Sequence, residues 1–213
     1  MSRRDSGRVE DGGVPAGNVF DKYGSQNPFI KWVMKRFDAT VSEFVAVASP
    51  ATVHEVGCGE GFWVLRWNER GIEARGSDVS ARIIEVARAD AVARGLSAHT
   101  FQVRDIYQME AGSDSAECVV CSEVLEHLER PGEGLEALQR IVERHLVVTV
   151  PREPLWRVLN LARGRYIRSL GNTPGHVQHW TRRGIVRLVS KYFEVVDVRC
   201  CGPWTMILCR PMR

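Results

Sequence analysis

A glutamate and a cluster of glycines in the first half of the chain have the spacing of a site for a nucleotide-like ligand. Glu55 lies near the end of a short apolar stretch and is followed by Gly57, Gly59 and Gly61. Glycines at a strand-to-helix turn let the backbone approach a ligand closely, and the helix that follows presents free N–H groups. The pattern is GxGxG, which differs from the GxGxxG of dinucleotide enzymes and lacks the Lys-Ser/Thr ending of a phosphate-binding loop. It therefore favours a nucleoside without a pyrophosphate.

Further carboxylates follow at the ends of the next two expected strands. Asp78 ends the second strand, where a carboxylate can accept hydrogen bonds from ribose hydroxyls. Asp105 follows the third strand and can accept from an adenine amino group, with Ile106 alongside. The carboxylate of Glu55 suits a ligand that carries an ammonium group or a positive sulfur. Together the three acids predict a cradle for a cationic nucleoside.

A second group of reactive side chains follows the fourth expected strand. If this segment is helical, Glu123, Glu126 and His127 share one face, and they could bind a divalent metal with one more ligand. His176 and His179, just before a later helix, are candidates for that ligand. Two other interpretations stay open. His127 could be a general base, or the segment could be structural, since a carboxylate near a helix start is stabilising in itself.

The elements that must position these residues alternate between strand and helix. Near-continuous apolar strands separated by amphipathic helices predict a parallel sheet that is covered on both faces. The final third adds an insert, a helix capped by Thr181 and two closing strands. The expected strands are 51–56, 73–77, 100–103, 118–121, 145–150, 194–200 and 205–209, and the expected helices are 28–44, 62–70, 81–94, 133–144, 155–170 and a last one from 182.

The sequence resembles the class I S-adenosylmethionine-dependent methyltransferases over about residues 52–211. The resemblance rests on residues 54–61 (HEVGCGEG), 76–80 (GSDVS) and 121–128 (CSEVLEHL). It implies a doubly wound α/β fold of the Rossmann-like type, with a seven-stranded, mostly parallel sheet that has one antiparallel strand. It also implies a role in cofactor binding for eight residues. Glu55 and the three glycines would hold the methionine end, Asp78 the ribose, and Asp105 and Ile106 the adenine, while Cys121 would line the pocket.

Within that class the chain is similar to the O-methyltransferases of ubiquinone biosynthesis and to enzymes that methylate the terminal 2′-hydroxyl of small RNAs. Both carry a Glu-x-x-Glu-His segment and a later histidine near a tryptophan or an acidic residue. The resemblance implies a divalent metal such as Mg²⁺ on Glu123, Glu126, His127 and His176, with catalytic roles for Glu123, His127 and His176. It also implies that the ion lowers the pKa of the acceptor oxygen and orients it for attack on the methyl carbon.

The insert, about residues 152–178, is expected to be a substrate cap. Its helix has a basic side and an apolar side, which suits a lid, contact with a membrane surface, or an anionic substrate. The lipid-quinone methyltransferases that the chain resembles carry a membrane-touching element here. A simple packing helix with a solvated basic face is the alternative. The expected apolar face comprises Leu155, Val158, Leu159, Ala162, Tyr166 and Leu170, and the opposite face comprises Arg157, Asn160, Gly164 and Arg168.

Length and composition predict one domain, residues 19–213, behind a disordered tail at 1–18. The chain has 213 residues and a formal net charge of +3, which argues against nucleic acid as the partner. No apolar run is long enough to span a bilayer, and the N-terminal residues lack the apolar core of a secretory signal. The six cysteines lie mostly in apolar runs, which indicates reduced thiols in a cytoplasmic protein.

These observations predict an enzyme that methylates a hydroxyl of a small molecule, with S-adenosylmethionine as the donor. The inserted helix and the segment around Tyr23 would close over the substrate. An RNA 2′-O-methyltransferase and a non-catalytic S-adenosylmethionine-binding partner protein are the alternatives.

Overall fold

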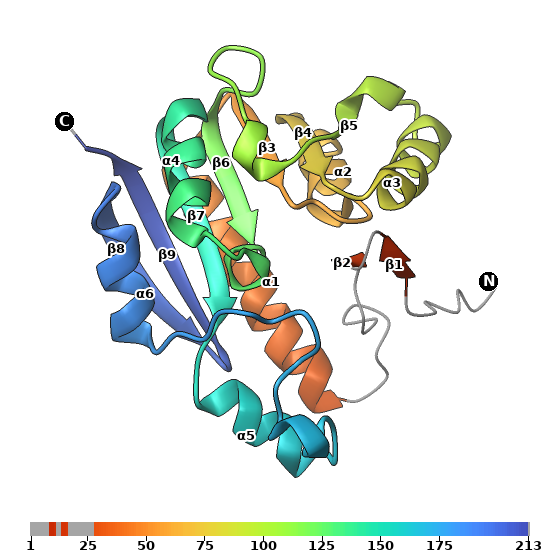
Figure 1. Ribbon diagram of the computed structural model, residues 1–213. Coiled ribbons are helices and arrows are strands. Elements are labelled where there is room, and N and C mark those ends of the chain that lie inside the picture. Colours follow the sequence, from red (N-terminus) through yellow and green to blue (C-terminus); the bar gives the residue numbers. More distant parts are fainter. Residues whose placement is uncertain (1–8, 12–13, 17–27, 213) are drawn as a thin grey trace.

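A seven-stranded sheet forms the centre of the computed structural model, which describes residues 9–11, 14–16 and 28–212 (Figure 1). The strand order is β5-β4-β3-β6-β7-β9-β8. β9 pairs antiparallel with both of its neighbours, and every other pair in the sheet is parallel. This confirms the predicted mostly parallel sheet with one antiparallel strand. The strands are β3 (Thr52–Val56), β4 (Glu73–Asp78), β5 (Phe101–Val103), β6 (Ala116–Ser122), β7 (Val142–Pro151), β8 (Phe193–Cys201) and β9 (Trp204–Pro211).

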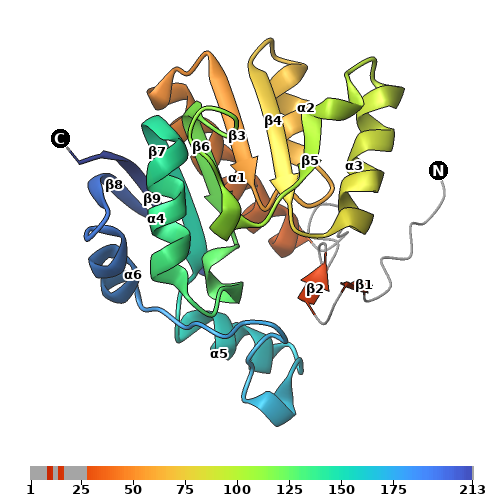
Figure 2. The same ribbon diagram turned by 45° about the horizontal axis from the view of Figure 1, so that its top comes forward.

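Helices cover both faces of this sheet, as the alternation of strand and helix predicts (Figure 2). α1, α2 and α3 pack on one face, and α4 and α6 pack on the other. Ser80 caps α3 by accepting from the backbone N–H of Ile83, and Thr181 caps α6 through Gly184, both as expected. The helices are α1 (Pro28–Ala48), α2 (Phe62–Asn68), α3 (Ala81–Ala93), α4 (Pro131–Ile141), α5 (Leu155–Ala162) and α6 (Arg182–Val189), with 3₁₀ turns η1 (Ala98–Thr100), η2 (Ile106–Gln108), η3 (Leu125–His127) and η4 (Ile167–Ser169).

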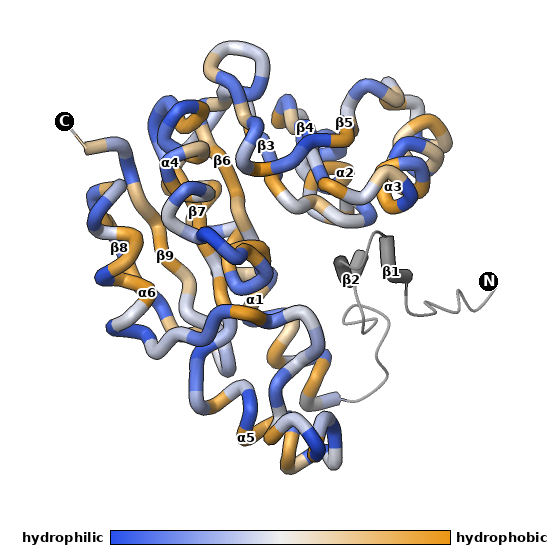
Figure 3. Tube along the Cα trace, viewed as in Figure 1, coloured by the Kyte–Doolittle hydropathy of each residue, from blue (hydrophilic) through white to orange (hydrophobic). Residues whose placement is uncertain are grey.

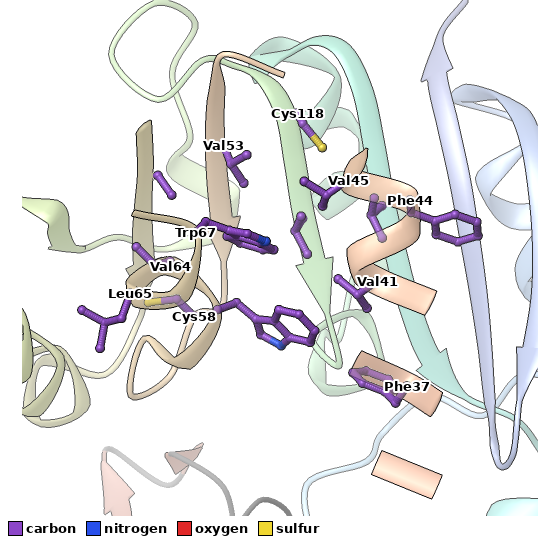
Figure 4. Packing of buried hydrophobic residues seen from close by; sticks show 14 of the residues in the cluster. Phe37, Val41, Phe44, Val45, Val53, Cys58, Val64, Leu65, Trp67 and Cys118 are labelled. Atoms are coloured by element: carbon purple, nitrogen blue, oxygen red, sulfur yellow. The ribbon is translucent and has the colours of Figure 1, made fainter. Parts of the chain in front are cut away.

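The two faces hold two hydrophobic clusters, each made by the apolar side of helices against the strands. Figure 4 shows Phe37, Val41 and Phe44 of α1 projecting toward the sheet, with Trp67 of α2 in the same layer. Phe44 is fully buried, so its truncation to alanine would cost about 3–5 kcal/mol. The strands are correspondingly apolar along much of their length, as Figure 3 shows for β6 and β9. This core fixes the strand ends that carry the reactive residues.

Several expected boundaries differ by a few residues. The third strand begins at Phe101, because the preceding residues form η1. The fifth strand begins at Val142, and the helix before it ends at Ile141. Within the tail expected to be disordered, β1 (Val9–Asp11) and β2 (Val14–Ala16) pair antiparallel. The rest of that tail and the segment around Tyr23 lie outside the described residues.

The insert folds differently from the single long helix that the sequence predicts. α5 ends at Ala162, and the chain turns back through Tyr166 and Leu170, which both have left-handed backbone conformations, around η4. The expected faces are also wrong, since Asn160 is 2% exposed and Val158 is 54% exposed. The reason is a hydrogen-bonded contact, because the amide of Asn160 donates to the carbonyl of Gly171 and so buries the polar side. α5 lies beyond the arrowheads of β6 and β7 (Figures 1 and 2).

Candidate active site

The glycine loop leaves β3 at its carboxyl end and curls over the neighbouring strand. The backbone N–H groups of Gly57 and Cys58 both donate to the carbonyl oxygen of Ser77, at 2.7 and 2.9 Å. β3 lies between β4 and β6 in the sheet, although β6 follows much later in the chain. Ligands of open α/β sheets bind at such a switch point, outside the carboxyl ends of the strands. The loop therefore has the position that the sequence predicts for it.

The three glycines are required for different reasons. All three have positive φ angles, and a Cβ on Gly57 or Gly61 would come within 2.2 Å of the Val124 side chain or 2.3 Å of the Phe101 ring. The absence of a side chain at Gly57 and Gly61 therefore allows the loop to pack against Val124 and Phe101. A Cβ on Gly59 would meet no atom of the described residues within 4 Å. Gly59 thus borders open space, where a ligand could approach the backbone.

Glu55 is a buried carboxyl group at the base of this loop. It accepts a hydrogen bond from the backbone N–H of Val64 in the first turn of α2. Burial raises the pKa of Glu55 well above its ordinary value, and the nearby carboxylate of Asp78 raises that pKa further. Its second oxygen, Oε2, has no hydrogen-bond partner among the described residues. A cationic group beside this oxygen would favour the ionised form.

Asp78 and Asp105 follow at the same edge of the sheet. Asp78 accepts hydrogen bonds from the backbone N–H groups of Gly59 and Ser80, both at 3.0 Å, and so ties the glycine loop to β4. The register pairs Asp78 with Val103, which places Asp105 just beyond the adjacent strand end. Asp105 accepts from the backbone N–H of Tyr107 at 3.0 Å. Each carboxylate oxygen has a second lone pair, so these backbone contacts leave capacity for ligand hydroxyls or an amino group.

Two other residues that the sequence assigns to cofactor binding are buried. Ile106 begins η2 directly after Asp105. Cys121 lies on β6 opposite Val56 of β3 and is fully buried. Burial raises the pKa of the Cys121 thiol, and the carboxylates of Glu126 and Glu55 raise that pKa further. Cys121 therefore lies between the glycine-loop side and the second group of reactive residues.

That second group is a cluster formed by Glu126, His127 and His176. One potential ligand atom from each residue lies within 4.8 Å of the others. His176 reaches the cluster because its loop is hydrogen-bonded to η3, where the backbone N–H groups of Val177 and Gln178 both donate to the carbonyl of Glu126. The sequence predicts this meeting of residues far apart in the chain, and the structure brings all three together.

The hydrogen bond of His127 indicates which ring nitrogen can react. Its Nδ1 lies 2.9 Å from the carbonyl oxygen of Gly175. A carbonyl only accepts, so Nδ1 carries the proton, and the lone pair of the neutral ring is on Nε2. The rings of His127 and His176 meet edge to face, with centroids 4.9 Å apart. His179 is the competing candidate from the sequence, and its Nδ1 instead lies 3.8 Å from Glu153 Oε1.

In the described part of the chain, Glu123 lies outside this cluster. Only residues 125–127 form a short 3₁₀ turn, so the expected single helical face for the three residues is wrong. Glu123 has a left-handed backbone, with φ at 59°, and its side chain points toward β7 and β9. Its Oε2 accepts from Trp204 Nε1 at 2.8 Å, and its Oε1 accepts from Thr149 Oγ1 at 3.3 Å.

Two tryptophans, Trp156 and Trp204, lie beside the cluster. Trp156 stacks on His176, with ring centroids 6.0 Å apart and planes 23° from parallel. Trp204 packs against Trp156 at 5.6 Å. The sequence places Trp156 at the start of the insert and Trp204 on a closing strand, but no spacing rule brings such distant residues together.

Comparison with known proteins finds similarity to methyltransferases. The family of methyltransferase domains matches residues 54–146. A ubiquinone biosynthesis O-methyltransferase of Serratia proteamaculans (strain 568) is 29% identical over 92 residues, 43% of this chain and 38% of the relative. Another, of Alkalilimnicola ehrlichii, is 27% identical over 149 residues, 64% of this chain and 60% of the relative. The chain thus spans less than two thirds of the length of these curated relatives.

Solved structures show the same fold. The magnesium protoporphyrin IX methyltransferase of Synechocystis PCC 6803, with bound SAH, superposes with a TM-score of 0.68 at 18% identity, covering 89% of this chain and 90% of that one. At this identity the likeness shows the fold alone. It confirms the predicted class I methyltransferase fold, and the family match over residues 54–146 supports S-adenosylmethionine as the cofactor.

Proposed function

We propose that this chain, which carries a methyltransferase domain of the S-adenosylmethionine-dependent class, transfers the methyl group of that cofactor to a hydroxyl oxygen of a small molecule. The observation that carries the proposal is the juxtaposition of two groups at one sheet edge. The cradle of Glu55, Asp78 and Asp105 surrounds the glycine loop, and the cluster of Glu126 and two histidines follows the adjacent strand β6. One group suits the donor and the other suits an acceptor oxygen.

The cradle fits a cationic nucleoside on features of its own residues. The buried oxygen of Glu55 that has no hydrogen-bond partner among the described residues suits the ammonium group or the sulfonium centre. The carboxylate of Asp78 would accept from the ribose hydroxyls, and Asp105 with Ile106 would bind the adenine. Gly59, which borders open space, would allow the cofactor to lie against the backbone. Cys121 would contribute to the wall of the pocket.

Methyl transfer to a hydroxyl needs a group that takes the hydroxyl proton as the oxygen attacks the methyl carbon. His127 is the residue that we assign to this step, because its Nδ1 donates to Gly175 and its Nε2 lone pair is on the other side of the ring. The backbone bonds from the His176 loop to Glu126 hold the cluster in place. Glu123 acts in our proposal by fixing Trp204 and Thr149 rather than by binding the acceptor.

The donor set of the cluster also fits a divalent metal. One carboxylate and two imidazoles within 4.8 Å form a common ligand set for Zn²⁺, Fe²⁺ or Mn²⁺, and suit Mg²⁺ less well. A histidine ligand usually donates its other ring N–H to a carbonyl or carboxylate, as His127 does to Gly175. As the alternative to a metal-free base, Glu126, His127 and His176 would hold such an ion, and the Nε2 lone pair of His127 would then be a ligand. The ion would lower the pKa of an acceptor hydroxyl.

The insert offers a surface for an anionic membrane beside this site. Ile167 and Leu170 are 63% and 68% exposed, and Leu161 is also exposed. The range 155–170 contains four arginines and no acidic residue. Exposed apolar side chains with arginines suit the interface of an anionic bilayer, where each basic residue contributes about 1 kcal/mol. Among the described residues no helix is long and apolar enough to cross a membrane, so this contact would be peripheral.

Vesicle sedimentation tests the membrane contact. We expect the protein to sediment with phosphatidylglycerol vesicles and not with phosphatidylcholine vesicles. Leu170→Ser should weaken this binding several-fold, whereas Val196→Ser, which changes an exposed apolar residue on β8, should not. Equal binding to both vesicle types, or none to either, would contradict the contact.

Methyl transfer from labelled S-adenosylmethionine tests the proposed function. We expect transfer to at least one member of a panel of phenols and other small hydroxyl compounds, and no transfer by Glu126→Gln if the cluster acts on the acceptor. Transfer instead to a small RNA with a free terminal 2′-hydroxyl, lost after periodate treatment, would support the RNA alternative. Cofactor binding with no transfer to either class would support a non-catalytic partner protein. Repeating the active reaction after chelation separates a metal from a metal-free base.

A further inference from the structure

An unbroken series of aromatic rings leads from the hydrophobic core to the reactive cluster. Phe37 of α1 packs edge-on against Trp204, with centroids 4.8 Å apart, and Trp204 packs against Trp156 at 5.6 Å. Trp156 then stacks on His176, which meets His127 edge to face. Phe37 and Trp204 are buried, so the far end of the series is anchored in the core. The ring of His176 therefore rests on a support that the core holds fixed.

Trp156 also holds the turn that carries His176. Its Nε1 donates to Thr173 Oγ1 at 2.9 Å, and the backbone carbonyl of Thr173 accepts from the backbone N–H of His176 at 3.1 Å. Asn160 donates to the same hydroxyl oxygen at 3.2 Å, which adds a bond from α5. One side chain thus contacts the ring of His176 and, through Thr173, its backbone. His176 itself lies in a segment without helix or strand, where its ring would otherwise have several rotamers.

Glu123 fixes the other tryptophan of the series. Its carboxylate accepts from Trp204 Nε1 at 2.8 Å, so both indole N–H groups are hydrogen-bonded within the described residues. Hydrogen bonds at both indoles restrict the rotation of each ring within its packing partners. The orientations of both indole rings in the contact between Trp156 and Trp204 are therefore fixed by hydrogen bonds.

We propose that Trp156 is a positioning residue that fixes the His176 ring in the Glu126–His127–His176 cluster and so couples the insert to that cluster. The inference rests on the proposed function only in taking this cluster as the reactive one. Trp156 acts through His176 and contacts neither cofactor nor acceptor in this proposal. A planar side chain at position 156 is required for stacking on the His176 ring. The indole N–H, which acts through Thr173, contributes less to the position of that ring.

Cobalt binding and a variant structure test the proposal. Titration of the full-length protein with Co²⁺ alone, followed by calorimetry, should show at least tenfold weaker binding for Trp156→Leu. Trp156→Phe keeps a planar ring and should stay within about threefold of the wild type, and Thr173→Val should be intermediate. Trp32→Phe removes an exposed indole elsewhere and is the matched control. The affinity for S-adenosylhomocysteine should be unchanged in all four variants.

Unchanged Co²⁺ affinity in Trp156→Leu would overturn the proposal. If the wild type binds no Co²⁺, the metal role under the proposed function fails, and crystal structures then decide the positioning role. We expect the His176 ring to leave the cluster in Trp156→Leu and to keep its place in Trp156→Phe, and a ring that keeps its place in both would overturn the proposal. If the leucine variant does not fold, the same two readouts on Thr173→Val decide, with an unmoved ring and unchanged affinity as the contradicting result.

Discussion

The two halves of the candidate site are built in different ways. The cofactor half uses short contiguous segments at the ends of β3, β4 and β5, and backbone hydrogen bonds such as those of Gly57 and Cys58 to Ser77 fix its shape. The cluster half takes Glu126 and His127 from one turn and His176 from a loop about fifty residues later. Its geometry depends on tertiary contacts, including the stack of Trp156 on His176. Substitutions should therefore damage the first half through backbone strain and clashes, and the second through lost positioning.

The sharpest contrast lies within the glycine loop. Gly61→Ala should lower the free energy of unfolding by about 3 kcal/mol, because its Cβ would overlap the Phe101 ring and the left-handed backbone adds strain. Gly59→Ala meets no such neighbour among the described residues and should cost about 1 kcal/mol of strain. Gly59→Ala should nevertheless weaken cofactor binding tenfold or more. Urea unfolding measures the stability of the two variants, and calorimetry measures their cofactor affinity. Equal loss of stability in Gly61→Ala and Gly59→Ala would contradict the different roles of the two glycines.

The pH dependence of stability should also come from the cofactor half. His54 on β3 is buried between the Asp114 carbonyl and the Ser77 hydroxyl, and burial lowers the pKa of His54 from 6.5 to about 4. The unfolded chain gains a proton below pH 6.5 that the folded protein gains only near pH 4. Stability should thus fall by about 3 kcal/mol as the pH drops through this window. Urea midpoints against pH test this, and a His54→Gln variant with the same slope as wild type would contradict it.

In the cluster half, loss of one ring should slow methyl transfer strongly without weakening the binding of the cofactor. His127→Ala should lower the rate of methyl transfer by about 10²-fold, since it removes the proposed base or ligand. His179→Ala is the matched control, because His179 faces Glu153 instead and should leave the rate within a few-fold. The affinity for S-adenosylhomocysteine should be the same in both variants. A wild-type rate in His127→Ala would remove this residue from the proposal.

The smallest predicted effect is a proton released by Glu55. Burial raises the pKa of Glu55 in the ligand-free protein, so this carboxyl group keeps its proton to higher pH than an exposed glutamate does. A bound cation favours the ionised form, so cofactor binding at a pH above the ordinary range of a glutamate should release a proton. The observed enthalpy should then become more exothermic in buffers of higher ionisation enthalpy. Glu55→Gln should lose this dependence, and a Gln variant that keeps it would assign the proton elsewhere.

The difference between the halves also explains what could be predicted from the sequence. The parallel part of the sheet and the acids at the strand ends follow from local apolar runs and from the glycine loop, whereas the antiparallel strand was implied by the family resemblance. The choice of His176 over His179 as the partner of Glu126 followed from a family resemblance. The insert was predicted less well, because Asn160 is buried by bonds to Gly171 and Thr173 that no helical period reveals. Glu123 likewise bonds to Trp204, which lies 81 residues away in the chain.

Calorimetric titration with S-adenosylmethionine tests the central claim most directly, since both halves serve one reaction only if the cradle binds the cofactor. We expect saturable binding with one site per chain, weakened at least tenfold by Asp78→Ala and unchanged by Asp90→Ala, a substitution on α3 outside the cradle. Absence of binding by the wild-type protein, or equal binding by Asp78→Ala, would contradict the account.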